Sequence, residues 1–169
     1  MTITIRPEEP RDADLVRLVN QSAFGRPDEA ALVDALRGSS DAISLVATIG
    51  DRIVGHILFT PVQITGTAPN AHAVGLAPMA VVPDYQRQGI GSQLVRAGLD
   101  ACRSAGWGAV VVIGHPNYYP RFGFVPASTK GLEYEHAVPP EAFMVLGLQA
   151  DALARVKGVV RFRPEFAAF

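Results

Sequence analysis

The stretch from Met79 to Ser92 constrains the fold of this chain more than any other. An apolar run there ends at a proline, and two closely spaced glycines follow before an amphipathic segment begins. A strand that leads through a glycine-rich turn into a helix leaves unpaired main-chain N–H groups beside the positive end of the helix dipole. Such an arrangement binds phosphate oxygens. The stretch therefore predicts an α/β protein with a phosphate-binding turn.

The residues around the glycines exclude two common phosphate motifs. A dinucleotide-binding turn has a small residue three positions after its second glycine, where this chain has Leu94. A P-loop has four residues between its glycines and then Lys-Ser/Thr, and this stretch has neither. The chain instead reads Gln-x-x-Gly-x-Gly at Gln86, Gly89 and Gly91. Taken alone, this spacing also fits an ordinary helix start.

A second motif follows the apolar run Val110–Ile113. The segment from Gly114 to Phe124 reads Gly-His-Pro-Asn-Tyr-Tyr-Pro-Arg-Phe-Gly-Phe. Together the two motifs resemble the GNAT N-acetyltransferase superfamily, whose pyrophosphate loop reads Gln/Arg-x-x-Gly-x-Gly/Ala and whose next strand leads to aromatic-Tyr-x-x-x-Gly-Phe. Tyr118 and Tyr119 take the aromatic-Tyr places. The sequence of Gly114–Phe124, together with 140–144 and 158–162, is similar to a YhbS-like bacterial branch of that superfamily.

The resemblance implies one GNAT domain over residues 1–169, with an acetyl-CoA-binding core at about 73–124 and a C-terminal extension at about 125–169. Its fold is α/β, a mixed sheet in which a central parallel strand pair splays apart between flanking helices. Pro78 lies within the expected strand Ala73–Val82. It fits a bulge at which that strand parts from its neighbour, although proline as a plain interruption is the alternative.

Periodicity and turn residues predict the remaining elements. The first helix is expected to begin at Asp12 or Asp14 and to bury Leu15, Leu18 and Val19. Residues 66–72 are expected to form a small polar loop, and 125–138 shows little periodicity. Further helices are expected near 28–37, 91–105 and 150–155, and strands at 2–6, 44–49, 52–60, 62–65, 110–113, 142–148 and 159–162.

The resemblance also implies acetyl-CoA as cosubstrate and assigns residues to it. Main-chain groups of the strand would pair with the pantetheine arm, and the loop would hold the pyrophosphate. Arg87 adds charge or is a solvated surface arginine, and Asn117 contacts pantetheine or caps a helix. The expected cofactor-binding residues are Met79, Ala80, Val81, Val82, Arg87, Gln88, Gly89, Ile90, Gly91, Ser92, Asn117 and Tyr119.

The implied reaction is direct transfer of the acetyl group, in a ternary complex, to a primary amine of a small molecule or peptide. Tyr119 takes the place of the general acid that protonates the departing thiolate; a core aromatic is the alternative. The strand Val74–Val82 contains no ionisable residue. A non-catalytic acyl-CoA-binding or sensing domain is therefore the competing reading. Candidates for the base are His56, His72, Glu133, Glu135 and His136.

Composition limits the partners. The chain has 169 residues and a formal net charge of −1, and its arginines form no run, so nucleic acid is not an expected partner. The single Cys102 cannot form an internal disulfide and is expected to be a buried thiol. We expect a cytoplasmic protein with no signal peptide and no membrane association. We also expect no metal, because the histidines lack ligand spacing. A C-terminal strand could serve a homodimer.

Overall fold

A computed structural model describes residues 2–66 and 72–168 of the chain. It divides into two compact units that alternate along the sequence. Unit 1 takes the described residues of Met1–Thr60, Ala77–Asp100 and Pro164–Phe169, and unit 2 takes Pro61–Leu76 and Ala101–Arg163. One domain over 1–169 remains a prediction. Most of the expected polar loop, residues 67–71, lies outside the described residues.

The strands of unit 1 follow the order β1-β2-β3-β4. They are β1 (Thr4–Pro7), β2 (Ile43–Ile49), the first part of β3 (Arg52–Ile64) and the last part of β4 (Ala73–Val81). β2 and β3 form the predicted antiparallel hairpin, with Ile43 opposite Phe59. Its turn contains Gly50 at φ +58°, a conformation that glycine adopts at little cost.

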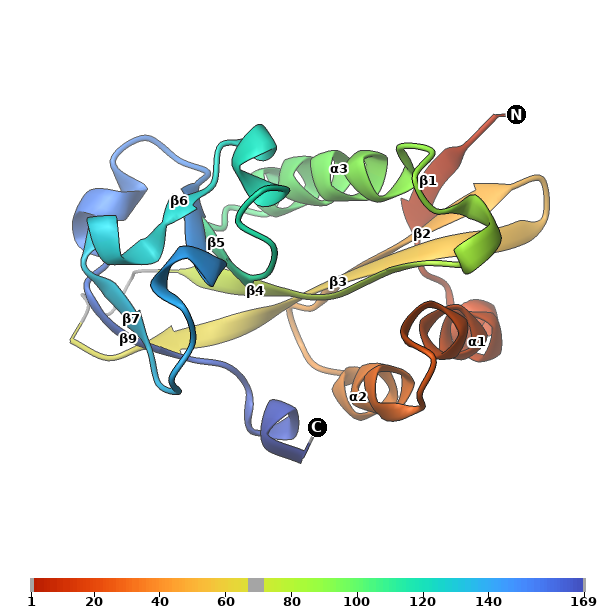
Figure 1. Ribbon diagram of the computed structural model, residues 1–169, viewed down its shortest axis with the longest axis horizontal. Helices are drawn as coiled ribbons and strands as arrows, with labels where there is room; N and C mark the ends of the chain where they lie inside the picture. The colour runs from red at the N-terminus through yellow and green to blue at the C-terminus, as the bar shows by residue number, and fades with distance from the viewer. Residues whose placement is uncertain (1, 67–71, 169) are drawn as a thin grey trace. The chain divides into compact units, whose positions relative to one another are not determined.

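Helices cover both faces of this sheet (Figure 1). α1 (Ala13–Phe24) and α2 (Asp28–Leu36) pack on one face, where Val16, Val33 and Leu58 share a core. α3 (Ile90–Ser104) lies on the other face. Gly98 allows its close approach, since a Cβ there would collide with the Phe59 ring.

The expected buried face of α1 was partly wrong. Leu15 and Leu18 are 45% and 57% exposed, whereas Val16, Val19 and Asn20 are buried. The sequence offers two apolar stripes with the same three-residue spacing, and both fit a helix. The sheet selects the stripe that contains Val16 and Val19.

Unit 2 is built on β5 (Ala109–Ile113) and β8 (Phe143–Gly147), which pair antiparallel. β6 (Val125–Pro126) follows β8, and the start of β4 pairs parallel with β5 from Ala73–Ala109 to Gly75–Val111. β7 (Leu132–Tyr134) pairs with β9 (Gly158–Arg161), which also meets the end of β3. The mixture of parallel and antiparallel pairs confirms the predicted α/β class with a mixed sheet.

Several predicted boundaries differ from the structure. The strands expected at 52–60 and 62–65 are one strand, β3, because it continues through Pro61 to pair with β9. β6 and β7 lie in 125–138, where strands of two and three residues are too short to show periodicity. The helix expected near 150 is a 3-10 turn. The 3-10 helices are Pro10–Asp12, Pro83–Tyr85, Tyr119–Phe122, Ala127–Lys130, Pro140–Ala142, Ala152–Arg155 and Pro164–Ala168.

Candidate functional site

The glycine loop, defined here as residues 87–92, joins a 3-10 turn to α3 within unit 1. Arg87 and Gly89 both have left-handed backbones, at φ +63° and +84°. A positive φ is unusual for a long side chain such as arginine, and such residues gather at functional sites. Left-handed residues within a turn direct successive N–H groups to one side and form an anion-binding concavity. The loop therefore has the backbone shape that its sequence predicted.

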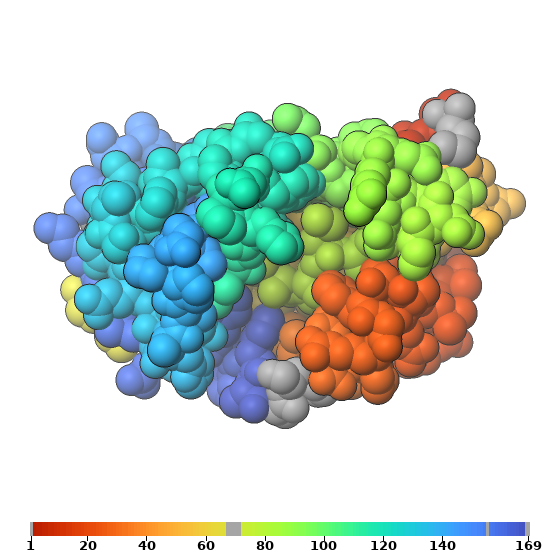
Figure 2. All heavy atoms as spheres, in the orientation of Figure 1, coloured from red at the N-terminus to blue at the C-terminus, as the bar shows by residue number. Residues whose placement is uncertain are grey.

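The main-chain amides of this loop are available to a ligand. Those from Arg87 to Gly91 donate to no acceptor among the residues that the structure describes. The neighbouring amides of Tyr85 and Gln86, in contrast, bond to Val82 O at 2.9 Å and Pro83 O at 3.3 Å. Figure 2 shows the yellow-green segment after β4 at the surface of the molecule. Consecutive donors without an internal acceptor can bind water or an anion.

The start of α3 strengthens this potential for anions. Gln93 N–H donates to Gly89 O at 3.1 Å, so the amides of Ile90 and Gly91 precede the first helical hydrogen bond. The first turn of the helix contains no acidic residue. The partial positive charge of the helix N-terminus is thus not neutralised from within the helix.

The end of β4, also in unit 1, presents a second row of main-chain groups. Val82 N–H donates to Val54 O of β3 at 2.9 Å. Because successive residues of a strand direct their polar groups to opposite edges, Ala80 and Val82 face β3, whereas Met79 and Val81 face the other edge. The main-chain polar groups of Met79 and Val81 thus point away from β3, and the expected contacts of Met79 to Val82 with pantetheine remain a prediction. Pro78 lies within the strand, after a cis peptide bond with Ala77.

Tyr119 lies in unit 2, at the start of the 3-10 helix Tyr119–Phe122. Its ring is packed edge-on against Phe124 at 5.7 Å and against Tyr118 at 5.1 Å, and Gly114 leaves the space that it fills. The residue is 8% exposed, and burial raises its pKa to about 12. Its hydroxyl has no hydrogen-bond partner among the described residues, yet it is not one of the fully buried unsatisfied atoms. The phenol is therefore protonated at neutral pH and can donate to a ligand.

Asn117 does not cap the helix that follows it. The N-cap residue is Tyr118, and that cap makes no side-chain hydrogen bond. Asn117 is exposed, and its main-chain oxygen accepts from Arg121 at 3.4 Å. The capping alternative is thus not observed, and a pantetheine contact remains a prediction.

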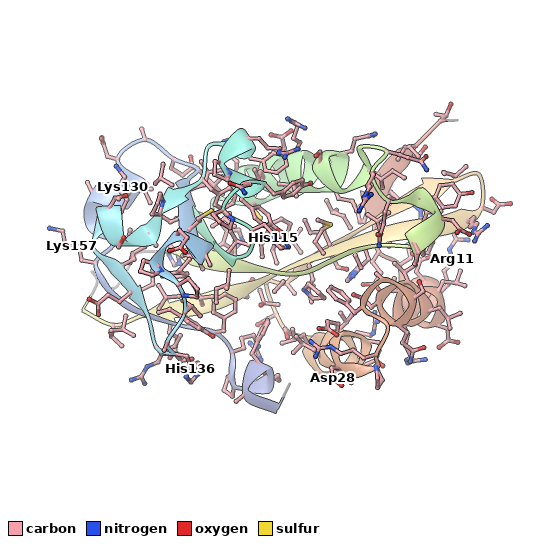
Figure 3. The ribbon with its side chains drawn as sticks, viewed as in Figure 1. Arg11, Asp28, His115, Lys130, His136 and Lys157 are labelled. Carbon is pink, nitrogen blue, oxygen red and sulfur yellow. The ribbon has the colours of Figure 1, made fainter. Side chains whose placement is uncertain are left out.

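The candidate bases are dispersed. His72 is exposed and lies edge-on to Trp107, 6.0 Å away. Glu135 is near both His136 and Arg161, at 3.6 and 3.7 Å, and Glu133 is exposed. Figure 3 shows His136 projecting outward from unit 2 at the end of β7. None of these residues is distinguished as a base by its surroundings within its own unit.

His56 is instead a buried structural residue of unit 1. Its Nδ1 lies 3.2 Å from the Asn20 amide nitrogen, and its Nε2 lies 2.8 Å from Ser44 Oγ. Ser44 donates to Glu8 at 2.6 Å, and Arg37 pairs with the same carboxylate. Since the Asn20 amide donates, the neutral ring accepts at Nδ1 and donates from Nε2. Burial lowers the pKa of His56 to about 4, which makes it a poor base.

The buried imidazole is expected to make unfolding depend on pH. In the unfolded chain its pKa returns to about 6.5, so the unfolded state binds the extra proton first as the pH falls. The stability contributed by the neutral ring is complete above about pH 6.5 and is lost toward pH 4, which amounts to about 3 kcal/mol. The free energy of unfolding would be measured in urea between pH 4 and 6.5 for wild type and His56→Gln. It should fall more steeply with decreasing pH in wild type than in the variant. Equal dependence on pH in the two proteins would contradict this prediction.

Cys102 has no role in the candidate site, and the described residues form neither a metal site nor a membrane-spanning helix. Cys102 is fully buried, and burial raises the pKa of its thiol to about 12, so it is not an activated nucleophile. No group of three or more His, Cys, Asp or Glu side chains able to hold a metal ion occurs in the described parts of the chain. No described helix is both long and apolar enough to cross a membrane.

The fold and the glycine loop define the class of protein to which the chain belongs. A family model for the acetyltransferase (GNAT) domain matches residues 40–126, which include β2, β3, β4, α3 and β5. The chain belongs to the GNAT acetyltransferase family.

Relatives place the chain near one branch of this family. It is 37% identical to the uncharacterized N-acetyltransferase YhbS of Escherichia coli (strain K12), over 98% of this chain and 99% of the relative. The crystal structure of E. coli YhbS in complex with CoA has a TM-score of 0.92, covering 99% of this chain and 93% of that one. A GNAT acetyltransferase from Brucella melitensis in complex with acetyl-CoA has 35% identity and a TM-score of 0.79, with 98% of each chain covered. The YhbS-like resemblance predicted from Gly114–Phe124, 140–144 and 158–162 is confirmed.

One residue of the site was missed by sequence reasoning. Gln86 opens the Gln-x-x-Gly-x-Gly motif but received no role there. In the structure its side-chain nitrogen donates to Val81 O at 2.8 Å. A glutamine one residue before the predicted loop was a signal in the sequence, but its partner could be identified only from the structure.

Proposed function

We propose that this chain is an acetyl-CoA-dependent N-acetyltransferase that transfers the acetyl group directly to a primary amine in a ternary complex. The observation that carries the proposal is the row of amides from Arg87 to Gly91, which lack an acceptor in the described structure. A diphosphate offers several anionic oxygens to such donors. The relatives YhbS and the Brucella enzyme, whose crystal structures hold CoA and acetyl-CoA, support this choice of ligand.

The main-chain edge of β4 is proposed to position the pantetheine arm. Met79 and Val81 direct their polar groups away from β3, so an extended chain of amides can pair with them as an added strand would. Holding the thioester in place in this way can supply several kcal/mol toward the barrier of acetyl transfer. The glycine loop and the end of β4, both in unit 1, would thus bind two parts of one acetyl-CoA molecule, the diphosphate and the pantetheine arm.

Tyr119 is proposed as the acid. The amine nitrogen attacks the thioester carbonyl carbon, the carbon–sulfur bond breaks, and the sulfur accepts a proton from the phenol. The amine gives up a proton to water or to a base, and the phenolate regains one from solvent, so protons balance over a cycle. The raised pKa keeps Tyr119 protonated until the sulfur develops charge.

A non-catalytic acyl-CoA sensor remains the second candidate, because 74–82 contains no carboxylate or histidine to serve as base. The two functions differ in turnover. The protein would be incubated with acetyl-CoA and a panel of primary amines and peptides, with free thiol and acetylated product measured by mass spectrometry. Product from any amine supports the enzyme, whereas CoA binding without product across the panel supports the sensor. A cytoplasmic location and a homodimer remain predictions.

A further inference from the structure

The glycine loop and the end of β4 are joined by a side chain as well as by the backbone. The connecting residues form the 3-10 turn Pro83–Tyr85, closed by bonds from Tyr85 N to Val82 O and from Gln86 N to Pro83 O. Gln86 Nε2 then reaches back to Val81 O at 2.8 Å, in a partly buried hydrogen bond. All of these residues belong to unit 1.

The position of this bond on β4 is informative. Val81 directs its carbonyl to the edge opposite β3, since the adjacent Val82 uses its amide to pair with β3. The Gln86 amide therefore contacts the same edge that presents the main-chain groups of Met79 and Val81. It meets that edge at its last strand residue, immediately before the turn that leads into the glycine loop.

We propose that Gln86 is a positioning residue that fixes the glycine loop relative to the edge of β4 that faces away from β3. The inference rests on the proposed function, in which the loop holds the diphosphate of CoA and the edge holds its pantetheine arm. With the bond in place, a ligand that occupies both segments meets them already in register. Without it, each segment can still bind its own part of the ligand, but the two must be ordered together at the moment of binding.

The neighbouring Gln88 does not provide the same link. Its side chain donates to Asp84 O at 3.2 Å, a bond within the turn and loop that does not reach β4. Gln86, unlike Gln88, therefore ties this segment to the strand by a side-chain hydrogen bond.

The test compares two ligands and two variants. Gln86→Met keeps the length of the side chain but cannot donate, and Gln86→Arg restores N–H donors. Calorimetry would measure the affinity for CoA, which spans both segments, and NMR titration would measure the affinity for ADP, which carries a diphosphate but no pantetheine arm. We expect Gln86→Met to bind CoA about tenfold more weakly than wild type, as befits one lost hydrogen bond, with ADP affinity changed less than about twofold. Gln86→Arg should recover most of the CoA affinity.

The outcomes separate the positioning role of Gln86 from the proposed function on which it rests. Equal CoA affinity in wild type and Gln86→Met would overturn the positioning role while leaving the proposed function intact. Equal weakening of CoA and ADP would also overturn it, because the substitution would then have disturbed the loop itself. Failure of wild type to bind CoA would overturn the proposed function, and the inference with it.

Discussion

Tyr119→Phe is expected to lower turnover by about 10²–10⁴-fold while leaving the affinity for acetyl-CoA nearly unchanged. The substitution removes only the phenolic oxygen. The ring contacts with Phe124 and Tyr118 remain, and no described group loses a hydrogen-bond partner. The free energy of unfolding should therefore change little, so a loss of rate would reflect the missing proton donor. Steady-state kinetics with an amine found in the panel would measure it.

The adjacent tyrosine provides a matched control. Tyr118→Phe removes the same oxygen one residue away, from a ring that meets Tyr119 edge to face and whose centroid lies 4.4 Å from the Arg121 guanidinium carbon. Its turnover is expected to stay close to wild type. If both variants lose rate equally, the loss does not single out the Tyr119 hydroxyl, and its assignment as the acid fails. If neither loses rate, Tyr119 is a core aromatic and the acid lies elsewhere.

Gly89→Val is expected to weaken CoA binding strongly. A Cβ at Gly89 would meet nothing within 4 Å in the protein, so a valine side chain would project into open space beside the loop, where we expect it to prevent close approach of a ligand to the backbone. It would obstruct hydrogen bonds from the loop amides to the diphosphate, each worth about 1.5–3 kcal/mol when the partner is charged. We expect the Kd for CoA to rise on the order of 10²-fold or more, as measured by calorimetry.

Backbone strain must be separated from this loss of binding, and Gly38 allows it. Gly38 has φ +87°, close to the +84° of Gly89, and its Cβ position is equally open. Valine at either site pays about 1–2 kcal/mol for a left-handed backbone, so the two variants should melt at similar temperatures. Only Gly89→Val should lose CoA affinity. Undiminished binding in that variant would remove the glycine loop from the site.

Features that neighbouring residues determine were predicted correctly from the sequence, and features that depend on distant contacts were not. The glycine loop was predictable because a left-handed turn and a helix start are set by neighbouring residues, as Gly89 and Gly91 illustrate. The hairpin of β2 and β3 was predictable for the same reason. β6 and β7 were not, since strands of two and three residues exist only through their partners. The choice between the two stripes of α1 likewise depended on a sheet far away in sequence.

The sequence by itself indicated the family through two motifs. It also indicated the main helices and strands and the turn at Gly89, because patterns of neighbouring residues set them. The tertiary structure alone decided that His56 is buried against Asn20 and Ser44 and so cannot serve as a ready base. It also decided that the Gln86 side chain donates to Val81 O, on the edge of β4 that faces away from β3. Burial and the choice of hydrogen-bond partner depend on which elements pack together, and no local pattern specifies that.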